Sequence, residues 1–433
     1  MRKVPPSEKT REAIRALLES GVEDEADPKS ELMRLATQLI LEEALEAKAR
    51  DVVGRGRYVR RGDGEEGYRN GYRRGRLKSS EGEVQYAVPQ LRDVPQEEIT
   101  RLRRLLKGRT EELERLAVEM WARGCSTRDI EAMFADEEGG SLLSRTAVSE
   151  ITEVLWAEYE EFSTRDLSEL RPLYLFLDGV AERLRPGSKR EAVLTAWCLT
   201  EDCRKVLLAV SPGTKESTEC CREFLEDLKR RGLPEPVLVV TDGAPGLIRS
   251  AEECLSLSLR QRCLAHKIRN IASKLPEDIR VAFTEAARAS YQAPSPAMAR
   301  ALRDDLVERY EKDSPSAVAC FLEDFEACIA HLRCPPAHRR VIRTTNLLER
   351  LFREERRRLG AAGTMFGERP VLKMMYAALV RAADRWRGIK VSAFEARQLE
   401  ALRQQLKEEH KKENEPVTSY KTRGSRPARL QQK

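Results

Sequence analysis

Two aspartates follow apolar runs in the same way. Asp178 comes after Leu173-Tyr-Leu-Phe-Leu, Asp242 comes after Val237-Leu-Val-Val-Thr, and a glycine follows each. An apolar run bounded by Asp-Gly is typical of a buried strand that ends at a turn. An ionised carboxylate there is costly unless it lies in a cleft, accepts hydrogen bonds or binds a cation. Together with Glu349, which stands in an arginine-rich stretch, the aspartates predict an oxygen-rich Mg²⁺ site suited to chemistry on phosphodiesters.

The order of elements around the aspartates supports this interpretation, because a single Asp-Gly pair is more often an ordinary turn. We expect strands at 171–178, 191–199 and 204–210, a helix at 217–231, a strand at 237–241, a helix at 245–253 and a strand at 255–262. Short connections between the first three strands predict an antiparallel meander. The β-β-β-α-β-α-β order predicts an α/β fold with a mixed five-stranded sheet of the ribonuclease-H-like type, with both aspartates at neighbouring strand ends.

The sequence after the sheet is helical. From 267 to 340 a helical pattern is interrupted at Pro276, at 294–296 and at 335–336, which indicates an all-helical insertion before Glu349. After Ala401 the chain becomes polar and basic, and we expect a disordered tail.

Basic residues cluster in the N-terminal region. The net charge of +6 says little, but the stretch 54–76 holds eight arginines, seven glycines and three tyrosines against three acids. A helix at 31–53 precedes it, and an extended piece at 82–89 follows. We expect 54–76 to be flexible and to contact phosphates and bases, a solvated basic loop being the alternative.

A helix-turn-helix is predicted further along. The first helix ends at Gly124, a capping box from Ser126 to Asp129 opens the second, and Ser144 opens a third. Such a region, preceded by the N-terminal helix, is expected to bind the DNA major groove, and plain helix packing is the alternative. The apolar face of the first helix comprises Leu113, Leu116, Ala117, Met120 and Trp121.

With these motifs placed, the chain resembles the Mutator-type transposases of bacterial insertion sequences, a family with an Asp-Asp-Glu catalytic triad. Asp242-Gly-Ala-Pro-Gly and Gln261-Arg-Cys-Leu-Ala-His are similar to the family's Asp-x3-Gly and Gln-Arg-Cys-x2-His signatures. Arg343-Thr-Thr-Asn-Leu-Leu-Glu349 resembles its glutamate helix, and Gly67-Tyr-Arg-Asn-Gly-Tyr-Arg its N-terminal region.

The resemblance covers roughly residues 30–395 and has two departures. Leu264 stands where the family often has Trp, and Leu255-Ser replaces a usual Phe-Pro. Neither departure touches the triad.

The resemblance implies a DNA transposase that binds the ends of its insertion sequence, cleaves phosphodiester bonds by metal-assisted hydrolysis and transfers the 3′-OH end to target DNA. Asp178, Asp242 and Glu349 would be its catalytic and metal-binding residues, holding two Mg²⁺ ions that Mn²⁺ can replace. The expected partners are double-stranded terminal inverted repeats and target DNA, bound by at least a homodimer. The expected DNA-contacting residues are Arg69, Arg73, Arg128, Arg145, Arg353, Arg356 and Arg357.

Cysteine and histidine are interpreted as structural. Cys263 and His266 are only half of a zinc site, so we expect a structural motif beside the active site. Cys320, Cys328 and Cys334, with a histidine between the last two, could not share one metal on a continuous helix and are expected to be buried. Ten cysteines without a predicted signal peptide or membrane span indicate reduced thiols in the bacterial cytoplasm, at the nucleoid when DNA is bound.

Two other functions remain open at this point. One is a transposase-derived DNA-binding regulator, and the other is a structure-selective nuclease without strand transfer. The predicted domains are the N-terminal Arg/Gly/Tyr-rich region 1–98, the helix-turn-helix region 99–165, the first part of the catalytic core 166–266, the insertion 267–340, the glutamate-helix part of the core 341–400 and the tail 401–433.

Overall fold

The structure is a computed structural model, and the chain forms two compact units. The first runs as far as Ala157 and the second begins at Glu158. The finer domain boundaries remain predictions. The residues described are 4–20, 28–57, 59, 67–80, 82–94, 108–135, 141–182, 191–213, 217–345, 352–353, 356–358, 367–383 and 388–414.

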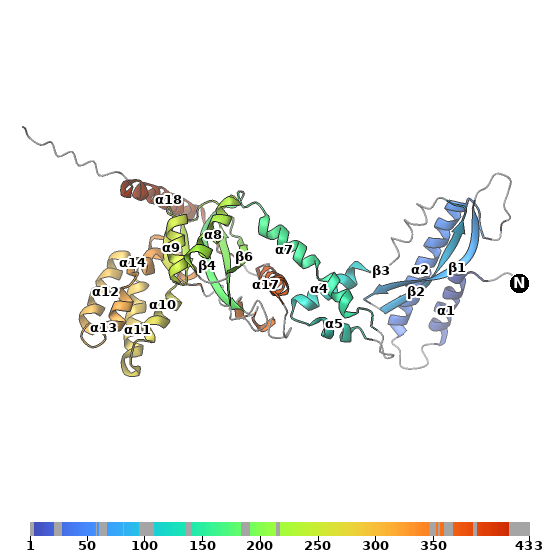
Figure 1. The fold of residues 1–433 in the computed structure, drawn as a ribbon, viewed down its shortest axis with the longest axis horizontal. Coiled ribbons are helices and arrows are strands. Elements are labelled where there is room, and N and C mark those ends of the chain that lie inside the picture. Colours follow the sequence, from blue (N-terminus) through green and yellow to red (C-terminus); the bar gives the residue numbers. More distant parts are fainter. Residues whose placement is uncertain are drawn as a thin grey trace, which may run out of the picture. The chain divides into compact units, whose positions relative to one another are not determined.

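The first unit opens with two helices that pack on each other, and the second of them packs on a small sheet (Figure 1). Buried Glu42 links them: one carboxylate oxygen accepts a hydrogen bond from the Thr10 hydroxyl at 2.8 Å, and the other accepts one from the Ala87 amide at 3.0 Å. β1 pairs antiparallel with β2 and parallel with β3. The elements are α1 Pro6–Ser20, α2 Pro28–Val53, β1 Tyr68–Ser79, β2 Gly82–Arg92 and β3 Gly108–Arg109.

The expectation of a flexible Arg/Gly/Tyr stretch is wrong for residues 68–76, which lie in β1. The strand is held by its ladder with β2, and by a carboxylate of α2 that binds two of its side chains. Glu46 accepts hydrogen bonds from the Arg69 guanidinium at 2.6 Å and from the Tyr72 hydroxyl. The predicted extended piece at 82–89 is confirmed as part of β2.

Three short helices complete the first unit. The Ser126–Asp129 capping box is confirmed, and Gly124, with φ +103°, follows the end of the first helix as predicted. Leu116 was placed on the apolar face but is 41% exposed, because only part of this face finds a partner. The helices are α4 Glu111–Ala122, α5 Thr127–Met133 and α6 Arg145–Ile151, and α7 Val154–Thr164 leads into the second unit.

A five-stranded mixed sheet forms the centre of the second unit, as predicted. Its order is β6-β5-β4-β7-β8, with β4, β5 and β6 antiparallel and β4, β7 and β8 parallel. The strands are β4 Pro172–Glu182, β5 Glu191–Thr200, β6 Lys205–Gly213, β7 Leu238–Thr241 and β8 Leu259–Arg262.

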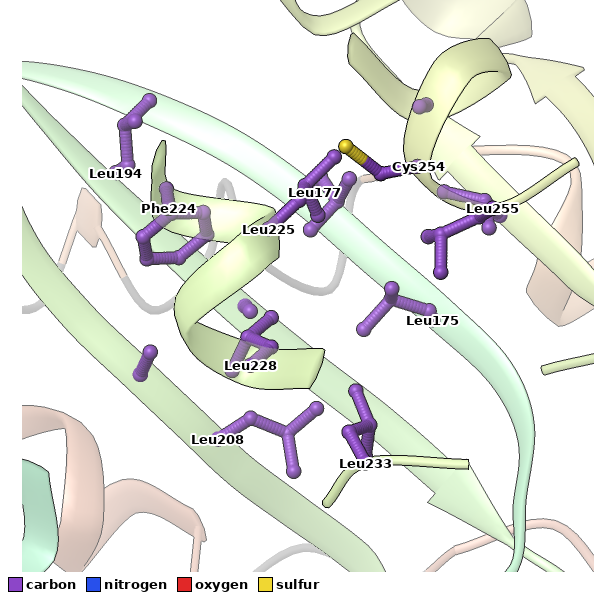
Figure 2. Close-up of a cluster of buried hydrophobic side chains, with 14 of the residues drawn as sticks. Leu175, Leu177, Leu194, Leu208, Phe224, Leu225, Leu228, Leu233, Cys254 and Leu255 are labelled. Carbon is purple, nitrogen blue, oxygen red and sulfur yellow. The ribbon is translucent and has the colours of Figure 1, made fainter. Parts of the chain in front are cut away.

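Each face of this sheet is covered. Helices α8 (Thr218–Arg230) and α9 (Pro245–Cys254) cover one face, where Leu175 and Leu177 of β4 belong to the same hydrophobic cluster as Leu225 of α8 (Figure 2). Because side chains alternate along a strand, Tyr174 and Phe176 point to the opposite face. There the Tyr174 hydroxyl lies 2.7 Å from Nδ1 of His338.

The helical insertion has a core of its own, built around Phe283, Tyr291 and Phe321. Its helices are predicted correctly as a class, with breaks at the expected prolines. Figure 1 shows them in yellow and orange. They are α10 Leu264–Ala272, α11 Glu277–Tyr291, α12 Pro296–Tyr310, α13 Pro315–Leu322, α14 Phe325–Ile329, the 3₁₀ turn η1 Ala330–Arg333 and α15 Pro336–Ile342.

Two helices follow in the C-terminal part. α17 (Glu368–Ala383) packs against β6, and α18 (Ala393–Glu413) buries Leu402 and Leu406. A disordered tail from residue 401 is therefore wrong for 401–413, because leucines at helical spacing anchor that segment. The rest of the predicted tail lies outside the described residues. Among the helices that the structure describes, none is long and apolar enough to cross a membrane.

Candidate active site

Asp178 and Asp242 occupy equivalent positions in adjacent parallel strands. The last pair that joins β4 to β7 is Leu177 with Thr241, so Asp178 follows Leu177 within β4 and Asp242 is the first residue after β7. The prediction that Asp178 ends its strand is wrong. β4 continues to Glu182 because β5 goes on pairing with it, Asp178 lying opposite Thr195. Asp178 thus stands where β4 loses one neighbour and keeps the other.

The electrostatics of the site indicate that the buried carboxyl of Asp178 lies near the half-buried carboxyl of Asp242. Asp178 is 5% exposed, and one of its oxygens accepts a hydrogen bond from the Gly179 amide at 3.0 Å. Burial, followed by the nearby charge of Asp242, raises the pKa of Asp178 to about 8, while His266 acts in the opposite direction. Asp242 accepts a hydrogen bond from the Ala244 amide at 2.9 Å, which fixes its orientation.

The turn after Asp242 requires glycine. Gly243 has φ +100°, a conformation that side chains with a Cβ rarely adopt. A Cβ at this position would also overlap the guanidinium of Arg262, which lies directly against the glycine. The turn then leads into α9 through Pro245, whose fixed φ suits the first turn of a helix.

Cys263 and His266 lie beside the two carboxylates. Cys263 is fully buried, and its sulfur accepts hydrogen bonds from the amide and hydroxyl of Thr345 at 3.3 and 3.4 Å. Burial works to raise the pKa of this thiol, but hydrogen bonds with His266 and Thr345 bring it below its ordinary value. A hydrogen bond with Cys263, and then the charges of Cys263, Asp178 and Asp242, raise the pKa of His266 against the opposing effect of burial.

Gln261 has a role that the sequence did not predict. Its buried amide donates to the carbonyls of Arg262 and Cys328 at 2.7 and 3.1 Å. Its oxygen accepts from the backbone amide of His331 at 2.8 Å and lies 3.1 Å from the Nδ1 of that histidine. The glutamine therefore joins β8 to α14 and η1 of the insertion. The similarity to the Gln-Arg-Cys signature was the signal that could have drawn attention to it.

Charged residues near Gln261 in the sequence add to this contact between β8 and the insertion. Arg260 donates to the Asp324 carboxylate at 2.9 Å, and Arg262 lies 3.9 Å from the same side chain. Lys267, which is fully buried, donates to the carbonyl of Glu323 at 2.6 Å. The segment that carries Cys263 and His266 is thus anchored to the insertion on both sides.

The remaining cysteines and the two departures from the family pattern lie in packed cores. Leu264 is buried in the core of the insertion and Leu255 in that of the sheet. Cys320, Cys328 and Cys334 are also buried, as predicted, on segments broken at Asp324 and after α14.

The glutamate of the predicted triad, Glu349, lies outside the described residues. Thr345 precedes it and is tied to Cys263, while 352–353 and 356–358 are helical. Phe352 is buried and Arg353 is exposed, as are Arg356 and Arg357. In the part of the chain that is described, no three His, Cys, Asp or Glu side chains are grouped to hold a metal. Among the residues that the structure describes, the two aspartates supply hard oxygen donors that suit Mg²⁺.

The other predicted DNA-contacting residues lie in the first unit. Arg73 and Arg128 are exposed. Arg69 is held by Glu46, and Arg145 lies 3.1 Å from the Glu131 carboxylate. Their contacts with DNA stay predictions.

The chain is similar to known proteins over most of its length. A family described as "Transposase, Mutator family" matches residues 9–388. The chain is 30% identical to the transposase for insertion sequence element IS6120 of Mycolicibacterium smegmatis over 62% of its own length and 84% of that protein. It is 28% identical to the ISRM5 transposase of Rhizobium meliloti strain 1021 over 82% and 88% of the two chains. It is 27% identical to the IS256 transposase of transposon Tn4001 from Staphylococcus aureus over 87% and 94%. The chain therefore belongs to the Mutator family of transposases.

Proposed function

We propose that this transposase cleaves DNA at the ends of its insertion sequence and joins the freed 3′-OH ends to target DNA, using Asp178, Asp242 and Glu349. In the first step water attacks the phosphorus, and the 3′ oxygen leaves as the 3′-OH. In the second step that hydroxyl attacks a target phosphodiester and displaces its 3′ oxygen. The two steps use the same kind of in-line displacement and need no covalent enzyme intermediate.

The observation that carries the proposal is the register of β4 and β7. It brings the buried carboxylate of Asp178 and the half-buried carboxylate of Asp242 to equivalent positions on two adjacent parallel strands of the mixed sheet. The strand order, an antiparallel meander extended by two parallel strands, is the order of the ribonuclease-H-like fold that we assign to the second unit.

The donor set at this edge fits divalent cations. Burial, and then the charge of Asp242, raises the pKa of Asp178, and a bound cation would oppose both effects. Asp178, Asp242 and Glu349 would hold two Mg²⁺ ions, with Mn²⁺ as a substitute. When bound, such ions activate the attacking oxygen and stabilise the leaving oxygen. The amides of Gly179 and Ala244 orient the two aspartates for this role.

DNA recognition is assigned to the first unit. Exposed Arg73 and Arg128 lie on a hairpin and on the second helix of the proposed helix-turn-helix, where they can reach phosphates. Two element ends must be held together for joining, so we propose at least a dimer on DNA.

The test is Mg²⁺-dependent cleavage and strand transfer on DNA that carries the element's own ends. We expect Asp242→Asn to lose both products while end binding remains, because the carboxylate charge is removed and the turn is kept. Asp305→Asn, the same change at an exposed site on α12, should leave both products unchanged.

Two outcomes would favour the other functions. Specific end binding by the wild type without any Mg²⁺-dependent product would favour a DNA-binding regulator. Cleavage without joined products would favour a nuclease.

A further inference from the structure

A groove of about 600 Å³ lies between α10, α11 and the segment just before the glutamate region. Its apolar wall includes Leu264 and Ile268 of α10 and Val281 of α11. Its lining includes four arginines from the two helices and that segment: Arg269, Arg280, Arg288 and Arg343.

The polar wall of the groove follows one face of α11. Arg280, Thr284 and Arg288 recur at four-residue spacing, so they share a helix face. Eight residues of helix place the two arginines about 12 Å apart along the axis. Both are exposed. Gln292 takes the next position in the same series, and its side-chain oxygen accepts a hydrogen bond from Arg343 at 2.6 Å.

The charge in the groove has one sign. Among the described residues that line it there is no aspartate or glutamate, and Glu277, Asp278 and Glu285 of α11 lie outside the lining. Burial, followed by the charge of Arg340, lowers the pKa of Arg343. The groove therefore concentrates positive potential and favours a polyanion.

The groove adjoins the carboxylate site. Leu264 follows Cys263 directly, and its amide donates to the carbonyl of Arg343 at 2.9 Å. On the other wall, Thr344 precedes Thr345, which donates to Cys263. The two segments that line this end of the groove are thus the ones that continue into the catalytic motifs.

We propose that this groove binds the sugar–phosphate backbone of the DNA that flanks the reacting phosphodiester. The inference rests on the function proposed above and names where in the second unit the DNA runs. A strand of B-DNA carries one phosphate per roughly 3.4 Å of axis, so the stripe from Arg280 to Arg288 is long enough for each arginine to meet a different phosphate. Guanidinium groups bind phosphate oxygens through two parallel hydrogen bonds, and the apolar wall can face the sugars.

The first test measures binding of the full chain to a linear DNA duplex of arbitrary sequence at several salt concentrations. The double variant Arg280→Gln/Arg288→Gln should bind roughly tenfold or more weakly at physiological salt, with a slope of log K against log [salt] that is shallower by about two. The matched control is Arg309→Gln/Lys312→Gln, which removes two exposed charges of the insertion outside the groove lining and should keep the wild-type slope.

One further double variant and a measurement of thermal unfolding guard against an effect on folding. Arg280→Lys/Arg288→Lys keeps both charges and should keep the salt slope, and thermal unfolding of all variants should match that of the wild type. A slope unchanged in the glutamine variant, or equally reduced in the control, would overturn the proposal.

The second test locates the DNA. A benzophenone amino acid at Val281, which is 64% exposed on the groove wall, should cross-link to DNA beside the cleavage site. The same group at Met298, 50% exposed on α12 and outside the lining, should not. Cross-linking of Val281 to a second protein chain would assign the groove to a protomer contact and overturn the inference.

The groove and the catalytic proposal can fail separately. If no Mg²⁺-dependent product forms while Val281 still cross-links to DNA, the proposed function fails and the groove remains a DNA-binding surface. If the wild type cleaves and joins DNA while the glutamine variant binds, cross-links and reacts like the control, the groove inference alone fails.

Discussion

At the scale of single residues, the proximity of Asp178 and Asp242 depends on the register between β4 and β7 more than on the Asp-Gly turns that the sequence predicted. Asp178 and Asp242 are 64 positions apart, yet each follows one member of the last β4–β7 pair. Their proximity therefore requires only that these two strands pair in this register. A slip of one residue would move every side chain of a strand to the other face and separate the carboxylates.

Gly243 provides a sharp test at this scale. We expect Gly243→Ala to destabilise the second unit by several kcal/mol, because positive φ costs about 1–3 kcal/mol for a residue with a Cβ and the Cβ also meets the Arg262 guanidinium. The measurement is urea unfolding followed by a signal from the second unit, with cleavage assayed in parallel.

The matched control is Gly367→Ala, also in the second unit. Gly367 has φ +105°, but its nearest neighbour for a Cβ is the Pro370 Cδ at 3.9 Å, so this variant carries backbone strain without overlap. Equal losses in the two variants would show that the contact with Arg262 has no energetic weight.

The sequence predicts the identity of the two aspartates but not the environment of either. An apolar run before each aspartate correctly predicts the strand that leads to it. It does not reveal that β5 goes on pairing beyond Asp178, because cross-strand pairing is decided by residues about 15 positions away. The raised pKa of Asp178 has the same origin, since burial is a property of the assembled sheet.

At the scale of elements, the main finding is the polar contact between β8 and the insertion. Gln261, Arg260 and Lys267 each bind a group between Glu323 and His331. The similarity to a family signature predicted that this segment matters, and the sequence predicted the insertion as helical. The docking of one on the other was beyond prediction, because it is formed by hydrogen bonds across roughly 60 to 70 residues of chain.

His331 should make the stability of this contact between β8 and the insertion depend on pH. It is 1% exposed, and burial, then the charges of Arg343 and Arg339, lowers its pKa to about 4. The unfolded chain, with an ordinary histidine pKa near 6.5, binds more protons than the folded chain between pH 4 and 6.5. The contribution of His331 to stability should therefore rise with pH across this window and fall by up to about 3 kcal/mol as pH drops from 6.5 to 4.

The measurement compares the free energy of unfolding of the wild type and of His331→Leu between pH 4 and 7.5. The variant loses a hydrogen bond to Gln261 at every pH, so its curve should start lower and decline less towards acid. Parallel curves would contradict the prediction.

Two elements show where composition misleads. The stretch 68–76 is glycine- and arginine-rich, which is typical of flexible chain, yet β2 and Glu46 hold it as a strand. Residues 401–413 are mostly polar, yet Leu402 and Leu406 suffice to anchor them as part of α18. In both cases a few long-range contacts outweigh local composition.

At the scale of the whole molecule, the chain has two units, and each unit has a hydrophobic core of its own. The first unit buries Leu45 of α2 with Val84 and Tyr86 of β2. The second buries its own set around β4 and α8. The proposed DNA-recognising arginines belong to the first unit, while the carboxylates and the arginine groove belong to the second.

Separate cores predict separate unfolding, because cooperativity requires shared buried contacts. We expect the full chain to unfold in two calorimetric transitions. Leu45→Ala removes a side chain that is 2% exposed and should lower only the transition of the first unit, by about 2–5 kcal/mol. Gly243→Ala should lower only the other transition.

If both substitutions shift one common transition, the two units unfold cooperatively. DNA binding by the first unit could then change the stability of the second unit, which carries the carboxylate site. If the transitions move independently, communication between recognition and cleavage must run through the DNA or through a second copy of the chain.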